Sequence, residues 1–287
     1  MKELVVISGK GGSGKTSMVA ALAQLAQNPV LCDADVDAAD LHLILSPRVV
    51  ESHEFMAGHT ASIDLEKCNG CGKCLELCRF GAISEDFVVD PLDCEGCGVC
   101  YYFCEQEAVN FPENLSGHWY ISESRFGPMV HARLGIAEEN SGKLVVQVRQ
   151  NAAKIADSNG HELVVTDGPP GVGCPVIAAI GGAAGVLIVT EPSLSGVHDM
   201  ERVVELARHF SVPPMICINK YDLNDSITED IRKFAEEKEV PCVGQIPFDP
   251  AVTKSMVHAQ TLFEYDPQAP ACDAVRALWE RVEKTLE

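Results

Sequence analysis

The sequence predicts an α/β fold in which a mostly parallel sheet is covered by helices on both faces and a small cysteine-rich domain is inserted. Short, almost continuously apolar runs recur along the chain, and segments of helical character separate them. Strands that are buried on both faces of a sheet carry such runs. Two cysteine runs of identical spacing interrupt this alternation and predict the insertion. The chain has 287 residues, enough for one large domain or two smaller ones.

The alternation gives each expected element a place in the sequence. We expect strands at residues 4–8, 30–32, 163–166, 185–190, 215–218 and 243–246. We expect helices at residues 16–27, 199–208, 228–238 and 271–286. Segment 113–142 is harder to assign: residues 119–121 have strand character, and the segment could brace the insertion against the sheet. We therefore expect an α/β domain formed by residues 1–60 and 113–287, with residues 61–112 as the inserted domain.

Composition excludes some classes of protein. The formal net charge is −20, which disfavours nucleic acid as a partner because phosphate binding needs a basic surface. Solubility explains the acidity, and docking to a basic redox partner protein is the second explanation. No secretory signal and no apolar stretch suited to a bilayer are visible, so we expect a cytoplasmic protein without membrane insertion. In that compartment, cysteines more often bind metal or stay free than form disulfides.

A glycine-rich loop lies between the first expected strand and the first expected helix. It matches the pattern G-x4-G-K-[ST] of a phosphate-binding loop in the strand–loop–helix context that this chemistry needs. Glycines let backbone N–H groups close on phosphate oxygens. Lys15 is expected to reach the β- and γ-phosphates, and Thr16 to place its hydroxyl on Mg²⁺. The nucleotide-binding residues expected here are Gly9, Gly11, Gly12, Ser13, Gly14, Lys15, Thr16 and Ser17.

Polar residues also follow three later strands at their carboxyl ends, where open α/β sheets bind ligands. Asp33 and Asp35 follow the second strand. Asp167 ends the third strand in the pattern of a Walker B acid, which holds a magnesium-bound water. Asn219 and Asp222 belong to an N-K-x-D sequence, which by itself suggests guanine recognition.

A second lysine in the glycine-rich loop, Lys10, is unusual for a phosphate-binding loop. With it, residues 9–16 resemble the deviant Walker motif of the MinD/ParA/Mrp superfamily of P-loop ATPases, and the resemblance covers most of the chain outside the insertion. The resemblance implies that Lys10 reaches the phosphates of a partner subunit in a nucleotide-sandwich dimer. That dimer is either a homodimer or a heterodimer with a paralogous ATPase. A cation directed at charge that develops during phosphoryl transfer acts like an arginine finger.

The same resemblance implies roles for the other polar residues. It places a switch at residues 33–37, where we assign Asp35 to the attacking water and Asp33 to the magnesium shell, with the reverse assignment as the alternative. The family's counterpart of Asn219 faces adenine, so we expect ATP, with GTP as the less favoured nucleotide. Pro247 belongs to a loop similar to the one that closes over the base. The expected catalytic residues are thus Lys10, Lys15, Asp35 and Asp167.

Eight of the 13 cysteines form two runs of the pattern C-x2-C-x2-C-x3-C, the second lying 26 residues after the first. This tandem pattern is typical of bacterial two-cluster ferredoxins, in which the fourth cysteine of each run ligates the other cluster. A zinc ribbon is the alternative, although it usually has two C-x2-C pairs with a longer spacer. The ligands expected are Cys68, Cys71, Cys74 and Cys104 for one [4Fe–4S] cluster, and Cys94, Cys97, Cys100 and Cys78 for the other.

Five cysteines lie outside these runs. Cys174 is expected to be a buried or interface thiol, with a redox or cluster role as the alternative. The other four lie in or beside apolar segments and are expected to be core thiols: Cys32, Cys217, Cys242 and Cys272.

Together these patterns predict a P-loop NTPase with an inserted ferredoxin-like domain that holds two [4Fe–4S] clusters. The expected function is that of a Mg²⁺-dependent ATPase, in which ATP-driven dimer and switch changes are coupled to electron transfer toward a redox partner. The alternative is an Mrp-like ATPase for iron–sulfur cluster or metalloprotein maturation.

Overall fold

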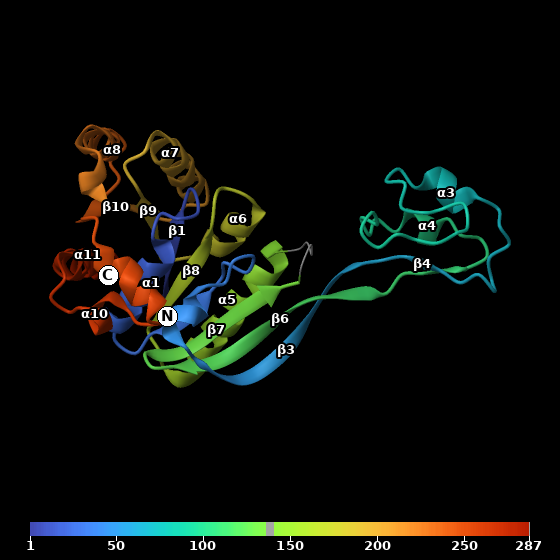
Figure 1. Cartoon of the computed structure of the whole chain (residues 1–287), viewed down its shortest axis with the longest axis horizontal. Helices are drawn as coiled ribbons and strands as arrows, with labels where there is room; N and C mark the ends of the chain where they lie inside the picture. Colours follow the sequence, from blue (N-terminus) through green and yellow to red (C-terminus); the bar gives the residue numbers. More distant parts are fainter. Residues whose placement is uncertain (136–140, 287) are drawn as a thin grey trace. The chain divides into compact units, whose positions relative to one another are not determined.

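The computed structural model describes residues 1–135 and 141–286, and the chain divides into two compact units (Figure 1). Unit 1 consists of Met1–His53, His118–Leu134 and Ser141–Glu287. Unit 2 consists mainly of Glu54–Gly117.

One sheet of nine strands runs through the described residues in the order β11-β10-β9-β1-β8-β2-β7-β6-β3. The parallel part of the sheet is the run β11-β10-β9-β1-β8-β2-β7, in which each strand is parallel to the next. All six expected strands are present, as β1 (Lys2–Ser8), β2 (Val30–Asp33), β8 (Leu163–Pro170), β9 (Gly185–Thr190), β10 (Pro214–Asn219) and β11 (Cys242–Ile246). The mostly parallel α/β sheet predicted from the apolar runs is thereby confirmed.

Helices cover both faces of this sheet, as the strand order requires. The chain crosses from β1 to β2 in one direction along the sheet, and from β8 through β9 and β10 to β11 in the other. Crossovers between parallel strands are right-handed, so the helices of these two sets lie on opposite faces. The helices are α1 (Lys15–Leu25), α5 (Ser141–Asn159), α6 (Cys174–Ile180), α7 (Leu194–His209), α8 (Asp225–Glu237), α9 (Pro250–Val257), α10 (Leu262–Tyr265) and α11 (Pro270–Leu286).

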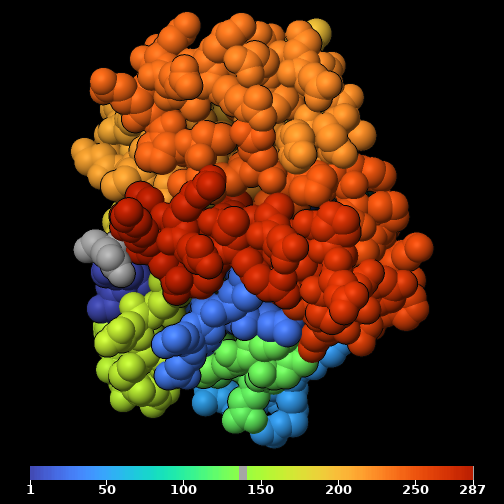
Figure 2. Space-filling model, turned by 90° about the vertical axis from the view of Figure 1, so that its left-hand side faces the viewer, coloured from blue at the N-terminus to red at the C-terminus, as the bar shows by residue number. Residues whose placement is uncertain are grey.

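The core on the α1 face is built from alternate residues of the central strands. Leu4 and Val6 of β1 and Leu187 of β9 pack in one cluster with α1 and with Leu278 and Val282 of α11. Figure 2 shows α11, in red, lying against the blue surface of the N-terminal segments. The intervening residues of β1, Val5 and Ile7, are also fully buried, which explains why the strands are apolar at successive positions.

Several elements in unit 1 were not predicted from the sequence. β7 (Gly127–Leu134) and helices α5 and α2 (Leu41–Leu45) lie in segments without a recognised pattern. The buried face of α5 includes two alanines, Ala152 and Ala156, and its exposed face is polar, so its apolar periodicity is weak.

The expected brace at residues 113–142 is instead part of the main sheet. It contains β6 (Glu113–Ser124) and β7, while its residues 136–140 lie outside the described residues. The expected start of α7 at residue 199 is also wrong. The helix begins at Leu194, because the hydroxyl of Ser193 accepts a hydrogen bond from the backbone N–H of Gly196 and caps it.

Unit 2 repeats one local structure twice. Its two short strands, β4 (Ser62–Ile63) and β5 (Val109–Asn110), pair in antiparallel fashion. Its helices α3 (Lys73–Leu77) and α4 (Val99–Tyr102) each follow a left-handed glycine, with φ 77° and ψ −4° at Gly72 and φ 74° and ψ −1° at Gly98. The duplication seen in the sequence is therefore a duplication of backbone conformation, which glycine adopts at little cost.

Strands β3 (Arg48–His59) and β6 each begin in one unit and end in the other. They are neighbours in the sheet, so the chain enters and leaves unit 2 along two paired strands.

A buried histidine in β7 makes the stability of unit 1 sensitive to acid. His131 is 7% exposed, and its Nε2 lies 2.9 Å from the hydroxyl of Ser122 in β6. Burial, with a smaller contribution from His42, lowers the pKa of His131 to about 4. The unfolded chain takes up this proton near pH 6.5 and the folded chain only near pH 4, so stability falls as the pH drops between these values.

We therefore expect His131→Asn to remove part of the acid sensitivity. Between pH 6.5 and 4, the free energy of unfolding of the wild type falls by up to about 3 kcal/mol more than that of the variant. Urea unfolding followed by circular dichroism at several pH values measures this difference, with the exposed His209→Asn as control. Parallel pH curves for wild type and His131→Asn would contradict the assignment.

Candidate nucleotide site

The glycine-rich loop joins the end of β1 to the first turn of α1. Gly12 and Gly14 have φ values of 81° and 91°, which side chains rarely adopt. A Cβ at Gly14 would collide with the side-chain amide of Asn219, and that amide donates a hydrogen bond to the carbonyl of Ser13 at 2.7 Å. The left-handed glycines thus shape the loop, and the side chain of Asn219 at the end of β10 holds it in place. It leaves Lys15 at the start of α1, next to the carboxyl ends of β2 and β8.

Lys15 is buried against two of the expected carboxylates. Its Nζ lies 2.5 Å from Oδ1 of Asp167 and 3.2 Å from Oδ2 of Asp35, and the residue is only 6% exposed. Burial opposes the ammonium charge, but attraction to Asp167 and Asp35 outweighs it, so the pKa of Lys15 is raised. Three residues that the sequence assigned to catalysis are therefore in direct contact, although they lie on separate elements.

Asp33 has a different environment from the one we expected. Its Oδ1 accepts a hydrogen bond from the N–H of Asp35 and its Oδ2 accepts one from the N–H of Leu41, both at 3.2 Å. Burial, and then the charge of Asp167, raise its pKa well above the ordinary value. Both oxygens thus shape the backbone that carries Asp35, and the assignment of Asp33 to the magnesium shell stays a prediction.

Asp167 fits a magnesium site better. Its Oδ2 is buried and has no hydrogen-bond partner among the described residues. A buried carboxylate oxygen left unpaired is costly, and carboxylates with a threonine hydroxyl are the ligands that Mg²⁺ uses beside nucleotide phosphates. Thr16, in the first turn of α1, supplies that hydroxyl in the predicted arrangement.

Lys10 is held by its own chain. Its Nζ lies 2.8 Å from Oε1 of Glu191 and donates to the hydroxyls of Ser193 and Ser195 at 3.1 and 3.0 Å. The second oxygen of Glu191 lies 3.3 Å from Nζ of Lys220, which also donates to the carbonyl of Gly12 at 3.1 Å.

Glu191 was not among the residues predicted from the sequence, although its position carries a signal. Glu191 directly follows β9, at the same edge of the sheet as the other site residues. The rule that ligands bind at the carboxyl ends of parallel strands would have selected it.

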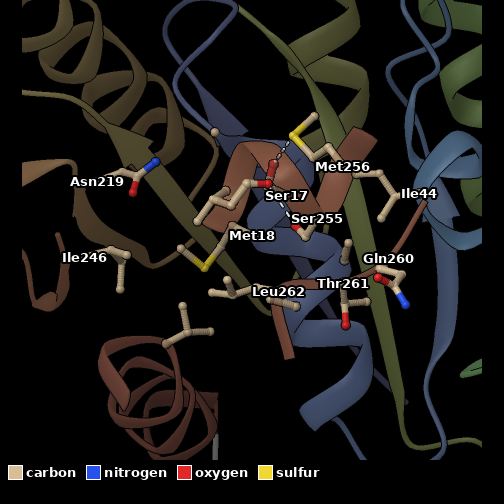
Figure 3. Close-up of a pocket in the computed structure, with 15 residues that line it drawn as sticks. Ser17, Met18, Ile44, Asn219, Ile246, Ser255, Met256, Gln260, Thr261 and Leu262 are labelled. Atoms are coloured by element: carbon tan, nitrogen blue, oxygen red, sulfur yellow. Dashed lines mark hydrogen bonds between the residues drawn. The ribbon is translucent and has the colours of Figure 1, made fainter. Parts of the chain in front are cut away.

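The side of the site expected to hold the base has a mainly apolar pocket (Figure 3). Residues of α1, α9 and the ends of β10 and β11 line it, among them Met18, Met256, Asn219 and Ile246. Asp222 contacts the loop after β11, where its Oδ1 accepts a hydrogen bond from the N–H of Phe248 at 2.7 Å. Pro247 lies in that same loop, next to Phe248.

In unit 2, the eight cysteines of the two runs surround two cavities. One cavity is lined by Cys68, Cys71, Cys74 and Cys104, with Cys100 also at its wall. The other is lined by Cys78, Cys94, Cys97 and Cys100. All eight are free thiols. In residues 1–135 and 141–286, no group of three or more His, Cys, Asp or Glu side chains is arranged to hold a metal ion, so ligation of two clusters stays a prediction.

Three of the other five cysteines are core thiols as expected: Cys32, Cys217 and Cys272 are buried. Cys242 is only partly buried. Cys174, at the first position of α6, is exposed, so it is not buried within the chain, and its expected place at an interface stays a prediction.

Comparison with known proteins identifies the class of this fold and then the family. The fold is similar to that of the septum site-determining protein MinD from Pyrococcus horikoshii complexed with Mg-ADP. The TM-score is 0.61 at 18% identity, covering 99% of this chain and 96% of that one. The cell division ATPase MinD of Pyrococcus furiosus gives a TM-score of 0.60 at 19% identity, covering 99% and 98%. These likenesses confirm the α/β P-loop NTPase fold.

The chain belongs to the family described as the CobQ/CobB/MinD/ParA nucleotide binding domain, which it matches over residues 4–262. It is 34% identical to an uncharacterized protein of Methanocaldococcus jannaschii over 288 residues, covering 99% of this chain and 97% of that protein. It is 24% identical to the septum site-determining protein MinD of Bacillus subtilis over 168 residues, covering 56% and 62%. The predicted membership of the MinD/ParA group is thereby confirmed.

In the part of the chain that the structure describes, no helix is long and apolar enough to cross a membrane.

The contacts of Lys15 predict that its removal affects both stability and binding. In Lys15→Met, Asp35 and Asp167 lose their shared cation, so we expect a loss of about 3 kcal/mol in the free energy of unfolding and no measurable binding of Mg·ATP by calorimetry. Lys15→Met combined with Asp35→Asn should regain part of the stability and none of the binding. Lys233→Met, at an exposed lysine of α8, is the control. Equal stability of wild type and Lys15→Met would contradict the buried ion pair.

Proposed function

We propose that this chain is a Mg²⁺-dependent ATPase whose ATP-driven switch and dimer changes are coupled to electron transfer through two [4Fe–4S] clusters in unit 2. The observation that carries the proposal is the sorting of eight cysteines around two cavities in the crossed sets that the sequence pattern predicts. The nucleotide-binding family of the chain and the contacts of Lys15, Asp35 and Asp167 support the ATPase half.

Each site residue has a defined task in this proposal. Lys15 exchanges a carboxylate for the β- and γ-phosphates, and Thr16 and Asp167 would hold Mg²⁺. Asp35 orients the water that attacks the γ-phosphorus. As the new P–O bond forms, the bond between the γ-phosphorus and the β–γ bridging oxygen breaks, so ADP leaves with that oxygen and the proton of the water is released with inorganic phosphate. Lys10 neutralises charge on the phosphates of a partner subunit, once it leaves Glu191, Ser193 and Ser195.

The base side supports ATP over GTP. A guanine-reading aspartate in an N-K-x-D sequence accepts hydrogen bonds from the base, whereas one oxygen of Asp222 already accepts from the N–H of Phe248. Asn219 donates its amide to the loop and keeps its carbonyl oxygen, an acceptor suited to the amino group of adenine.

The composition of unit 2 fits two clusters. Gly70, Gly72, Gly96 and Gly98 all have positive φ values, and their lack of side chains leaves backbone N–H groups free to approach sulfur. One such contact is present: the N–H of Ala108 donates to Sγ of Cys104 at 3.3 Å. When bound, each cluster would accept or release one electron, at a potential set by such hydrogen bonds and by exposure.

The charge of unit 2 supports a basic redox partner. Residues 54–117 contain twelve acidic and three basic residues, so a partner with a basic surface would be attracted electrostatically.

A second candidate is a carrier ATPase for cluster maturation. The exposure of Cys71 and Cys97, one in each run, favours it, because a client thiol could reach an exposed ligand position. Incubation with an apo-ferredoxin separates the two functions: a carrier loses its iron to the client, whereas an electron-transfer protein keeps it.

The metal content tests the cluster half. The protein purified without oxygen should contain about eight iron and eight sulfide per chain and give two EPR signals after reduction. Cys104→Ser and Cys78→Ser should each weaken a different signal, because each serves the other run's cluster. In the intact protein, Mg·ATP should shift at least one midpoint potential. Zinc in place of iron would end the proposal, and unchanged potentials would end the coupling.

Lys10→Ala tests the role assigned to this lysine in trans. We expect the variant to bind Mg·ATP with an affinity within about threefold of wild type and to lose at least about tenfold in turnover and in ATP-dependent dimerisation. Nucleotide calorimetry, phosphate release and analytical ultracentrifugation measure the three quantities, with the exposed Lys233→Ala of α8 as control. Full turnover by Lys10→Ala would refute the assignment.

A further inference from the structure

The β6–β7 hairpin contacts one segment of the nucleotide site at both of its ends and at points between them. This segment, residues 33–45, contains Asp33, Asp35 and helix α2 and is called the switch segment below. β7 pairs with β2 so that His131 is in register with Asp33. Beyond the paired region, the N–H of Leu134 in β7 donates to the carbonyl of Val36 at 3.2 Å. The first half of the switch segment is thus bound along β7.

A stack of aromatic rings binds the first turn of α2. The ring of His42 stacks on that of His131, with centroids 5.7 Å apart and planes 11° apart. The ring of His131 stacks in turn on that of Tyr120 in β6, at 5.1 Å and 28°. The hydroxyl of Ser122, also in β6, lies 2.9 Å from Nε2 of His131. Three elements, α2, β7 and β6, are thereby connected through one buried side chain.

Arg125, in the turn of the hairpin, binds the other end of α2. Its guanidinium donates to the carbonyl of Ile44 at 3.0 Å and to the carbonyl of Leu45, which are among the last carbonyls of the helix. A cation at a helix C-terminus is favourable, because those carbonyls carry partial negative charge and lack partners within the helix. The same guanidinium is held by both oxygens of Glu264 in α10, at 2.6 and 2.7 Å, so its position is fixed.

The switch segment also leads directly into the strands that enter unit 2. Only Ser46 and Pro47 separate α2 from β3. β3 pairs with β6, and both strands continue from unit 1 into unit 2. The hairpin strand that carries Tyr120 is therefore the same strand that reaches residue 113 in unit 2.

The nucleotide has a physical means of moving the switch segment. Asp35 shares the ammonium of Lys15 with Asp167, and the phosphates of a nucleotide compete for that same ammonium. Asp35 must then change partners. Its N–H is bonded to Asp33, and Asp33 is bonded to the first N–H of α2, so a change at Asp35 acts on the position of α2.

We propose that the β6–β7 hairpin carries this change from the switch segment into β3 and β6, and that Arg125 and His131 are the positioning residues that make the connection. This proposal rests on the proposed function, because it requires that nucleotide binds at Lys15. It names the route by which the nucleotide acts on unit 2. The route is built from side-chain contacts that are far apart in the sequence, so each contact can be removed without touching the phosphate loop.

Hydrogen exchange followed by mass spectrometry tests the route in the intact protein. Calorimetry first establishes that Mg·ATP binds, since an absence of binding would overturn the proposed function together with this inference. In the wild type, Mg·ATP should change the hydrogen-exchange rate of peptides that cover residues 33–45. It should also change the rate of peptides that cover residues 113–124, by at least about twofold. In Arg125→Ala, the change at residues 33–45 should persist and the change at residues 113–124 should be lost.

Two further variants separate transmission from general weakening of the fold. His131→Asn keeps a polar side chain beside Ser122 but removes the ring stack, so it should also lose the response at residues 113–124. Arg232→Ala removes a partly exposed arginine that contacts Glu229 and Gln245, far along the sheet, and should keep the full response. Nucleotide binding without a response at residues 113–124 in the wild type would overturn the proposal. A full response in both Arg125→Ala and His131→Asn would do the same.

Discussion

The buried ammonium of Lys15 is the interaction on which the rest of the nucleotide site depends. Strands β2 and β8 end side by side, and each brings carboxylates to the same point. One cation stands among Asp33, Asp35 and Asp167, and it cannot neutralise all three. The site therefore holds three carboxyl groups around one cation in a largely buried region, where each interaction is stronger than at the surface. Any cation or phosphate that binds here must rearrange these partners.

The rearrangement has consequences beyond the site because of where the chain goes next. The backbone after Asp35 forms α2 and then β3, and the hairpin β6–β7 contacts this segment at Val36 and at α2. The two strands that lead to unit 2, β3 and β6, pair with each other in the sheet. The chain therefore enters and leaves the insertion at one place. Unit 2 can then keep its own repeated structure without interrupting the parallel core of unit 1.

Lys10 contacts Glu191, Ser193 and Ser195 of its own chain, and the proposed function requires that it exchange these partners. Glu191 pairs with both Lys10 and Lys220, and hydrogen bonds to the two lysines lower its pKa against the opposing effect of burial. These groups are partly exposed, so each contact contributes little. A lysine held by several weak contacts keeps a defined position and can still exchange its partners, which suits a residue that acts on another subunit.

The parallel sheet, the phosphate loop and the duplicated cysteine segment could be predicted from the amino-acid sequence. Each of these is encoded locally: in apolar runs that reflect burial on both faces, in glycines that permit left-handed backbone, and in the spacing of identical residues. The tertiary structure alone decided the partners of Lys10, the exposure of Cys174, the role of both Asp33 oxygens and the contacts of Arg125 and His131. These depend on which distant strands become neighbours. Strand order is fixed by the packing of the whole chain, and no short segment carries that information.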